Sequence, residues 1–235
     1  MAEADRRNQL RERLHAVEQR IAAACDRAHR SRDDVTLVAV TKTVDADVAN
    51  LIVELGVRHL GENRPQELWR KAELLPSETR WHLIGHFQRN KIERTLPLVH
   101  LTHSVDSVRL LEALEKEAAR QQRTAPILLE CNVSGEASKQ GFRPDDALAL
   151  LPVLLKCAHV HAMGLMTMAP LLDAEECRPT FRRLRELRDR LRSELGAPHE
   201  MHHLSMGMSN DFEIAIEEGA TFIRLGSVLF EGLSA

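Results

Sequence analysis

Val35-Thr-Leu-Val-Ala-Val-Thr41, followed by Lys42, is the most strand-like run of the sequence. Apolar and β-branched residues fill it, which favours a buried strand of a parallel sheet. Lys42 at its carboxyl end would have its ammonium among hydrophobic walls, where desolvation disfavours the charged form. A neutral amine in that place can form a Schiff base with an aldehyde. The same position also suits a strand-end lysine that points into solvent. Other features of the sequence are needed to distinguish these two roles of Lys42. The other lysines lie in polar or helix-like surroundings: Lys71, Lys91, Lys116, Lys139 and Lys156.

Strand-like runs recur along the chain and alternate with stretches of helical periodicity. The expected strands are 35–41, 57–60, 81–84, 99–102, 127–131, 160–166, 202–205 and 221–225. The expected helices are one from Asp45 or Asp47 to Gly56, then 65–74, 88–96, 108–118, 144–157 and 175–195, and one from Ser209 or Asn210 to Gly219. Eight strands alternating with helices predict an α/β fold with a parallel sheet, closed as a single (β/α)8 TIM barrel. An open doubly wound sheet is the alternative.

The two ends of the chain predict one departure from a regular barrel. Only residues 228–235 follow the last strand, too few for an eighth helix of ordinary length. A helix is expected before the first strand instead. Its apolar stripe consists of Leu10, Leu14, Val17, Ile21 and Ala24. We therefore expect this extra N-terminal helix to cover the gap, or part of the gap, that an eighth helix would fill.

Composition and charge argue against two classes of partner. The formal net charge of -3 gives no electrostatic reason to expect nucleic acid or an anionic membrane surface. The arginine-rich stretch 178–192 is interleaved with acidic residues, which is typical of a solvated helix face rather than an RNA-binding stripe. The N-terminus lacks the apolar core of a signal peptide, and no apolar run reaches membrane-spanning length.

Cysteines and histidines do not form a metal-ligand pattern. Cys25, Cys131, Cys157 and Cys177 are widely spaced, which predicts neither a disulfide framework nor a zinc site and fits a reducing cytoplasm. His202 and His203 would point to opposite faces of a strand. We expect no carboxylate or cysteine to join the pair His159-x-His161 and complete a site. No metal is predicted.

Two segments rich in small residues follow the seventh and eighth expected strands. They are Ser205-Met-Gly-Met-Ser209 and Arg224-Leu-Gly-Ser227. Barrels often bind phosphate between the loops after these strands, where small residues let backbone N–H groups approach the anion. Each loop alone is explained as well by an ordinary helix cap or turn. Together with Lys42 on the neighbouring first strand, they suggest a phosphorylated aldehyde held by its phosphate and captured as an imine.

Seven segments of the sequence match one known family: Val38-Ala-Val-Thr-Lys-Thr43, Gly61-Glu-Asn63, Trp81-His-Leu-Ile-Gly-His-Phe-Gln-Arg-Asn-Lys91, Asn132-Val-Ser-Gly-Glu-Ala-Ser-Lys139 with Gly141-Phe142, Gly164-Leu-Met166, Ser205–Ser209 and Arg224–Ser227. On these segments the sequence closely resembles the pyridoxal phosphate homeostasis proteins, a family that looks like the barrel domain of alanine racemase without its second domain. The segments extend from the first strand to the eighth, so the resemblance covers nearly the whole chain. It implies that residues 1–235 form a single pyridoxal-phosphate-binding barrel domain of the alanine racemase N-terminal type.

The resemblance also implies which residues surround a bound pyridoxal 5′-phosphate. Lys42 would carry the internal aldimine, and Asn63 would lie close to the cofactor. Ser205, Gly226 and Ser227 would hold the phosphate, in a pocket also lined by Met206 and Gly207. Arg224 matches the arginine that faces the pyridine nitrogen in racemase-type barrels. A cation there cannot accept a proton from the ring, so the ring should be a poor electron sink.

The absence of tyrosine bears on whether the chain is an enzyme. Racemases of this barrel type use a tyrosine from the second domain as one of two opposed bases, and this sequence contains no tyrosine. Racemisation needs a base on each face of the cofactor, and we can name only Lys42. Cys131, His82 and His202-His203 are the other candidates for a second base, but a structural role suits each better. We therefore expect no catalytic residue and a non-catalytic carrier that takes part in intracellular vitamin B6 homeostasis.

Three other functions stay open at this point. One is a pyridoxal-phosphate-dependent racemase-like enzyme with an unrecognised second base. Another is a class I aldolase-like barrel whose lysine binds a sugar phosphate directly, and the third is an interaction module without chemistry. For the carrier we expect a cytoplasmic monomer that delivers its cofactor to apo-forms of pyridoxal-phosphate enzymes. The tail Phe230-Glu-Gly-Leu-Ser-Ala235 departs from the family pattern of Phe-Gly-Ala-Arg and an aromatic, which leaves its packing open.

Overall fold

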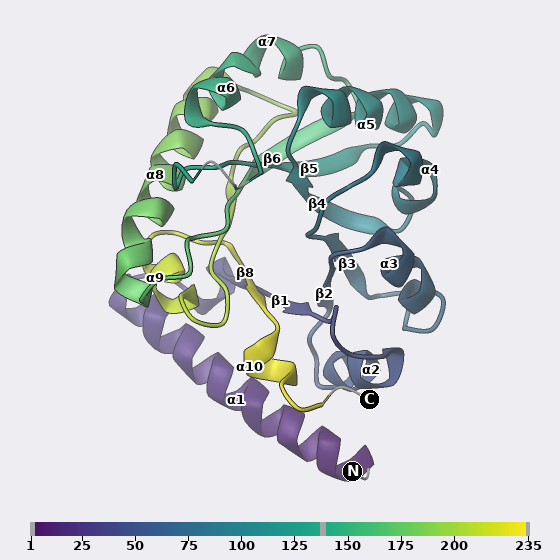
Figure 1. The fold of residues 1–235 in the computed structure, drawn as a ribbon, viewed down its shortest axis with the longest axis vertical. Coiled ribbons are helices and arrows are strands. Elements are labelled where there is room, and N and C mark those ends of the chain that lie inside the picture. Colours follow the sequence, from purple (N-terminus) through teal and green to yellow (C-terminus); the bar gives the residue numbers. More distant parts are fainter. Residues whose placement is uncertain (1–2, 137–139, 234–235) are drawn as a thin grey trace.

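Eight parallel strands close into a barrel in a computed structural model that describes residues 3–136 and 140–233 (Figure 1). The strands follow sequence order around the barrel, and the last pairs with the first. They are β1 (Thr36–Val40), β2 (His59–Glu62), β3 (Arg80–Leu83), β4 (Val99–Val105), β5 (Ala125–Glu130), β6 (Val160–Met166), β7 (His203–Ser205) and β8 (Phe222–Leu225). The predicted closed barrel is confirmed, and the open sheet is excluded.

Helices surround this barrel on the outside (Figure 1). The α-helices are α1 (Glu3–Arg27), α2 (Ala46–Glu54), α3 (Pro65–Ala72), α4 (Ile92–Thr95), α5 (Val108–Arg120), α6 (Pro144–Ala149), α7 (Leu151–Leu154), α8 (Ala174–Glu194), α9 (Phe212–Glu217) and α10 (Ser227–Phe230), with 3-10 turns at Arg32–Asp34 and Arg89–Lys91. Side chains between strands and helices form the larger apolar core. A smaller apolar cluster fills part of the barrel interior and consists of Val38, Leu101, Leu128, Met166 and Phe222.

Three helices differ clearly from their predicted form. The helix expected at 88–96 is a 3-10 turn at Arg89–Lys91 followed by the short α4. The single helix expected at 144–157 is divided into α6 and α7, and Pro152 lies in the first turn of α7, where its missing N–H costs least. The helix expected from Ser209 or Asn210 begins only at Phe212. Its start is delayed because the Asp211 carboxylate accepts the N–H of Met208 at 2.6 Å, which holds these residues in a turn.

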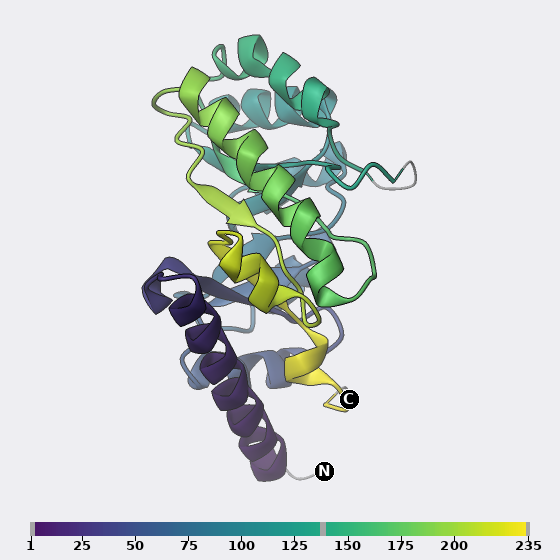
Figure 2. The same ribbon diagram turned by 90° about the vertical axis from the view of Figure 1, so that its left-hand side faces the viewer.

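The N-terminal helix packs against the barrel as expected. α1 contacts α9, α10 and α2, so it closes the side where an eighth helix would otherwise lie (Figure 2). Its buried face includes Leu10, Val17 and Ile21. Arg13 also donates to the backbone carbonyls of Leu229 at 3.1 Å and Glu231 at 2.7 Å. The helix therefore fixes the segment that follows β8.

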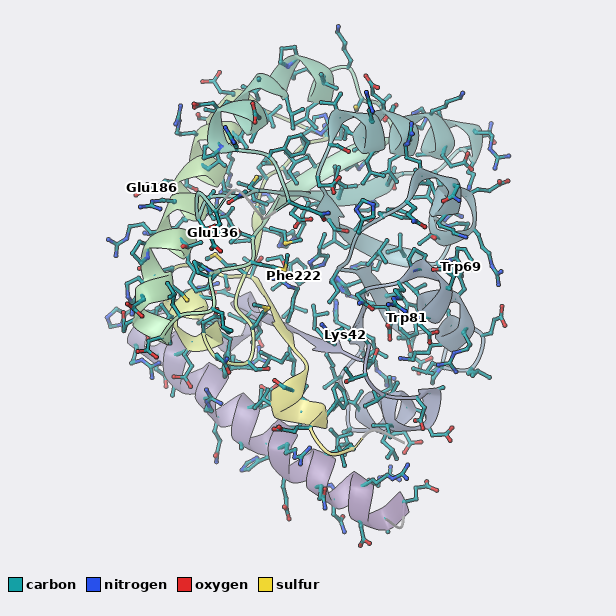
Figure 3. All side chains as sticks on the ribbon, in the orientation of Figure 1. Lys42, Trp69, Trp81, Glu136, Glu186 and Phe222 are labelled. Carbon is teal, nitrogen blue, oxygen red and sulfur yellow. The ribbon has the colours of Figure 1, made fainter. Side chains whose placement is uncertain are left out.

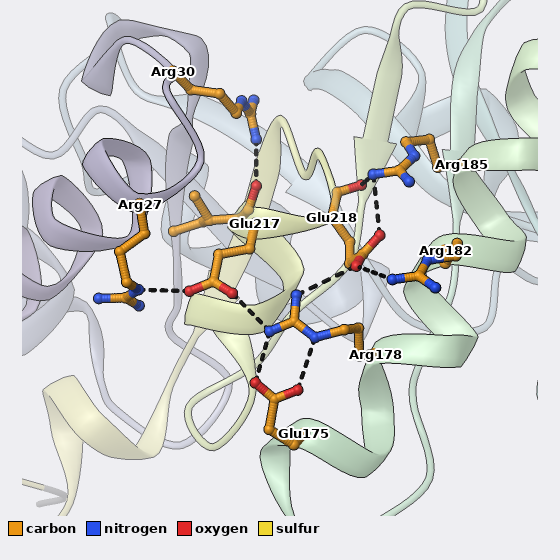
Figure 4. A network of polar contacts seen from close by, with 9 residues as sticks. Arg27, Arg30, Glu175, Arg178, Arg182, Arg185, Glu217 and Glu218 are labelled. Carbon is orange, nitrogen blue, oxygen red and sulfur yellow. Dashed lines mark hydrogen bonds and ion pairs between the residues drawn. The ribbon is translucent and has the colours of Figure 1, made fainter.

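Part of the solvated helix face predicted for residues 178–192 forms ion pairs with the end of α9: Arg178, Arg182 and Arg185 contact Glu217 or Glu218 (Figure 4). Glu218 is buried and lies within 3.3 Å of Arg178, 3.1 Å of Arg182 and 3.0 Å of Arg185. Burial raises the pKa of the Glu218 carboxyl, but the hydrogen bonds and charges of these arginines outweigh it and leave the pKa below its ordinary value of 4.5. Arg178 also contacts Glu217, which pairs with Arg27 of α1.

Glu218→Gln should therefore lower stability at neutral pH by about 2 kcal/mol, because three guanidinium groups lose a buried charged acceptor. The carboxyl has a lower pKa folded than unfolded, so its contribution is present above pH 4.5 and is lost as the pH falls through the folded pKa. Urea unfolding at pH 7 and pH 3.5 should show a wild-type advantage at the higher pH that shrinks at the lower. An equal difference at both values would contradict this assignment.

Candidate functional site

A cavity of about 670 Å³ opens at the carboxyl ends of the strands, the mouth at which TIM barrels place their functional residues. Five of the eight residues predicted to surround a ligand line it: Lys42, Asn63, Arg224, Gly226 and Ser227. Arg224 belongs to β8, and the other four lie directly after β1, β2 and β8. Lys42 lies at the edge of the barrel opening (Figure 3). The sequence segments that suggested a site therefore converge in one place.

Lys42 is more exposed than its strand-end position predicted. β1 ends at Val40, Thr41 is fully buried, and Lys42 follows in a turn where solvent reaches it. The expectation of an ammonium enclosed by hydrophobic walls was wrong for this reason: the side chain lies at the open mouth and not beneath it. Lys42 is thus accessible to a ligand that enters from solvent.

A buried ion pair lies directly behind Lys42, and sequence analysis missed it. Lys71 of α3 is 1% exposed and its Nζ lies 2.6 Å from the Glu62 Oε1 carboxylate oxygen. The same ammonium donates to the carbonyl oxygen of Thr41 at 2.7 Å, and the Thr41 hydroxyl donates to Glu62 at 2.7 Å. This network holds the residues that precede Lys42 and Asn63. Lys71 lies on a helix, as predicted, but its side chain is buried, which its spacing from Pro65 and Leu68 on one helix face could have indicated.

Asn63 follows β2 and lies against the backbone of Gly85. A Cβ built at Gly85 would lie 2.4 Å from the Asn63 carbonyl oxygen, closer than side chains tolerate. Only glycine therefore fits at this point of the turn after β3. The requirement explains the glycine in Ile84-Gly85-His86 and fixes Asn63 beside the cavity.

The loops after β7 and β8 meet at the cavity wall. Gly226 and Ser227 of one loop line it, as do Met208, Ser209 and Asn210 of the other. The N–H of Val228 approaches the Ser209 hydroxyl at 3.4 Å, which links the two loops. Backbone groups and hydroxyls of such small residues suit an anionic oxygen ligand.

Three predicted site residues lie outside the lining of the cavity. Ser205 and Met206 are fully buried, and the Ser205 hydroxyl contacts Arg224 and His103 inside the barrel. Gly207 has a φ of +93° and packs so closely on α9 that a Cβ would lie 2.6 Å from Ala215 Cβ. The residues at the start of the Ser205–Ser209 segment are therefore packed inside the protein. Only Met208 and the residues after it line the cavity.

Arg224 lies in the floor of the cavity and is 5% exposed. Its Nη1 donates to Ser205 Oγ at 2.6 Å and its Nη2 to the carbonyl oxygen of Thr167 at 2.9 Å. Burial lowers the pKa of the guanidinium to about 10, against the opposing charges of Asp211 and Glu130. The group therefore remains a cation at neutral pH.

Glu130 is a further titratable residue that sequence analysis did not single out. It ends β5 and is 5% exposed. Burial and the nearby charge of Asp106 raise the pKa of its carboxyl to about 7. The sequence around Glu130 does not indicate a functional role, because only the closed barrel places this residue near Arg224.

Within residues 3–136 and 140–233, no group of three histidine, cysteine or acidic side chains is arranged to hold a metal ion. The same part of the chain contains no helix long and apolar enough to cross a membrane. The four cysteines are free and buried. The tail described up to Leu233 packs against the core at that residue, and residues 137–139 of the Asn132–Lys139 segment lie outside the described part.

The sequence matches the family described as "Alanine racemase, N-terminal domain" over residues 13–234. It is 42% identical to the pyridoxal phosphate homeostasis protein of Aquifex aeolicus, with 93% of this chain and 96% of that protein covered. The crystal structure of an unknown protein from Bifidobacterium adolescentis superposes with a TM-score of 0.91 at 37% identity, covering 98% of this chain and 97% of that chain. PipY of Synechococcus elongatus, whose structure has PLP bound, superposes with a TM-score of 0.81 at 34% identity, covering 94% and 99%. The chain thus belongs to the alanine racemase N-terminal domain family and, within it, to the pyridoxal phosphate homeostasis proteins.

Proposed function

We propose that this protein binds pyridoxal 5′-phosphate reversibly through Lys42 and takes part in vitamin B6 homeostasis as a carrier without turnover of its own. The observation that carries the proposal is the convergence of Lys42, Arg224 and the Gly226-Ser227 segment on one cavity. β1 and β8 are neighbours in the closed barrel, so an amine and an anion-binding loop lie side by side. The names of the relatives above point to pyridoxal 5′-phosphate, whose aldehyde and phosphate fit this amine and this loop.

The residues present suit each part of this cofactor. The cofactor supplies an aldehyde, which a lysine amine binds covalently and reversibly. Lys42 is exposed at the mouth, so it can receive the ligand and release it. We assign the phosphate to Gly226 and Ser227, and add Ser209 because it lines the same wall. Arg224 would face the ring and Asn63 would flank it, while Ser205, Met206 and Gly207 support the floor and wall from behind.

A carrier role is favoured over catalysis by the side chains that line the cavity. Racemisation requires a second base opposite the lysine, and the sequence contains no tyrosine. Neither Cys131, His82 nor the pair His202-His203 lines the cavity in the described part of the chain. Burial also raises the pKa of the Cys131 thiol far above its ordinary value, which removes it as a base. Asp211 does line the cavity, but it accepts the N–H of Met208 within its own loop.

The remaining parts of the proposal concern partners and location. An exposed lysine at an open mouth suits delivery to apo-forms of pyridoxal-phosphate enzymes. Four free, buried cysteines fit a reducing compartment, and we assign the protein to the cytoplasm. We also propose that the carrier acts as a monomer.

Loading the purified protein with pyridoxal 5′-phosphate tests this function. After removal of free cofactor, we expect visible absorption from about one retained equivalent, and recovery of activity when the protein is mixed with an apoenzyme. The loaded protein should not racemise or decarboxylate amino acids at rates of roughly 1 per second or more, the range of ordinary enzymes. Turnover at such rates that requires Lys42 would replace the carrier with an enzyme. A colourless protein that cleaves a sugar phosphate would point to an aldolase.

A further inference from the structure

A series of buried hydrogen bonds runs through the inside of the barrel and ends at Arg224. His59 Nδ1 lies 2.8 Å from His82 Nε2, and His82 Nδ1 lies 2.8 Å from His103 Nε2. His103 Nδ1 lies 2.8 Å from Ser205 Oγ, and this hydroxyl accepts from Arg224 at 2.6 Å. We call His59, His82, His103 and Ser205 the histidine relay.

The relay connects the two mouths of the barrel. His59 begins β2 and is half-buried, so it lies at the N-terminal mouth, whereas Arg224 lines the cavity at the other mouth. His82 and His103 are fully buried. The ring of Phe222 lies in the middle of the barrel and packs 5.5 Å and 5.6 Å from these two imidazoles (Figure 3). Each inner member therefore depends on its neighbours in the relay for hydrogen bonds.

The direction of these hydrogen bonds follows from Arg224. A guanidinium only donates, so Ser205 must accept from it and has a single proton left to give. Among the described residues, the remaining partner of that hydroxyl is His103 Nδ1. His103 then carries its proton on Nε2 and donates to His82, which in turn donates from Nε2 to His59. Every donor thus points away from Arg224.

Neutral histidines are required for this arrangement, since a protonated imidazole would place two donors in one hydrogen bond. Burial holds the pKa of His82 and His103 well below the ordinary value of 6.5, and neighbouring histidines lower it further. Burial lowers the pKa of His59 to about 4. The relay is therefore uncharged at neutral pH.

We propose that His82 and His103 are positioning residues, which act through Ser205 to hold the guanidinium of Arg224 toward the ligand cavity. The inference rests on the proposed function, because Arg224 is the group assigned to the cofactor ring. It also gives Ser205 a role other than phosphate binding: its hydroxyl is occupied by the relay.

Acid is expected to disturb this arrangement from the N-terminal mouth. His59 is the relay member nearest to solvent, and its protonation would reverse its bond to His82 and add a cation to the series ending at Arg224. The charged and titratable groups acting on the relay from the surrounding strands are Arg80 of β3, His100 of β4 and His203 of β7. Glu130 of β5 and Asp211 after β7 act on Arg224 itself.

The test uses Ser205→Ala, which breaks the link, and His103→Gln, which keeps a donor and an acceptor at that position. His202→Gln, at an exposed histidine directly before β7, is the matched control. Cofactor affinity is measured by absorption titration between pH 5 and pH 8. We expect roughly tenfold weaker binding for Ser205→Ala and a change in its pH profile, since an orphaned buried donor loses about one hydrogen bond. His103→Gln should retain more affinity than Ser205→Ala, and His202→Gln should match the wild type.

A second measurement uses the cofactor-free wild type and does not depend on any variant folding. Histidine 15N spectra at neutral pH should show His82 and His103 neutral and protonated on Nε2. Protonation on Nδ1 of His103, or unchanged affinity and pH profile in Ser205→Ala, would overturn the proposal. Failure of the proposed function looks different, because wild-type protein would then not react with pyridoxal 5′-phosphate at all.

Discussion

Lys42→Ala is expected to abolish covalent retention of pyridoxal 5′-phosphate and, with it, the visible absorption of the loaded protein. The amine is the only group of the site that can bind an aldehyde covalently at the cavity mouth: Lys71 is committed to Glu62 and Thr41, and the other described lysines do not line the cavity. Binding through the phosphate and Arg224 alone should be weaker by two orders of magnitude or more, corresponding to about 3 kcal/mol. Absorption before and after gel filtration measures the loss.

Two further variants separate charge from chemistry. Lys42→Arg keeps a cation at the mouth but cannot bind the aldehyde, so it should fail to retain the cofactor. Lys116→Ala removes an exposed lysine of α5 and should behave as the wild type. Borohydride treatment of the loaded wild type should fix the cofactor to Lys42, as peptide mapping can verify. Retention of colour by Lys42→Ala, with label on another residue, would refute the assignment of the lysine.

Much of the fold was predictable because it depends on local patterns. Alternating strand and helix signals gave all eight strands to within a few residues, and the closure of eight parallel strands follows from their number. The misplaced boundaries have local causes that propensity does not reveal. One is the turn held by Asp211 before α9, and another is Pro152 in the first turn of α7.

The site was predictable only in part, since it depends on contacts between distant residues. Strand ends and small-residue loops identified the cavity wall, but they did not show that the Ser205 hydroxyl points into the barrel. The histidine relay joins residues from four strands, with 102 positions separating His103 from Ser205. Such a series is recognised once the barrel brings the strands together. His82 belongs to a segment that carries the family resemblance, but its place in the relay follows only from the structure.

Removing one partner of the buried Lys71–Glu62 pair is expected to lower the free energy of unfolding more than Glu218→Gln does. Lys71→Met leaves a carboxylate that is fully buried and whose second oxygen, Oε2, has no hydrogen-bond partner in the described structure. Breaking such a pair costs about 3–5 kcal/mol, because the remaining charge is desolvated without compensation. Urea unfolding with an unchanged m-value would report this as a shift of the midpoint.

The exposed pair Arg58–Glu78 provides a matched control, because its side chains are 47% and 56% exposed. Glu78→Gln should cost about 1 kcal/mol or less, since exposed ion pairs contribute little. A loss below about 1 kcal/mol for Lys71→Met as well would show that the buried charge is compensated in a way the structure does not reveal.

The double variant Lys71→Met/Glu62→Leu separates stability from function at the same place. Replacing both charges by apolar groups should recover most of the stability lost in Lys71→Met, because no unpaired charge remains. The Thr41 carbonyl and hydroxyl nevertheless lose their partners, and these atoms precede Lys42 directly. We therefore expect a well-folded protein whose cofactor affinity stays below that of the wild type. Full recovery of both properties would mean that the pair serves stability alone, and that Lys42 is positioned by the strand without help from the network behind it.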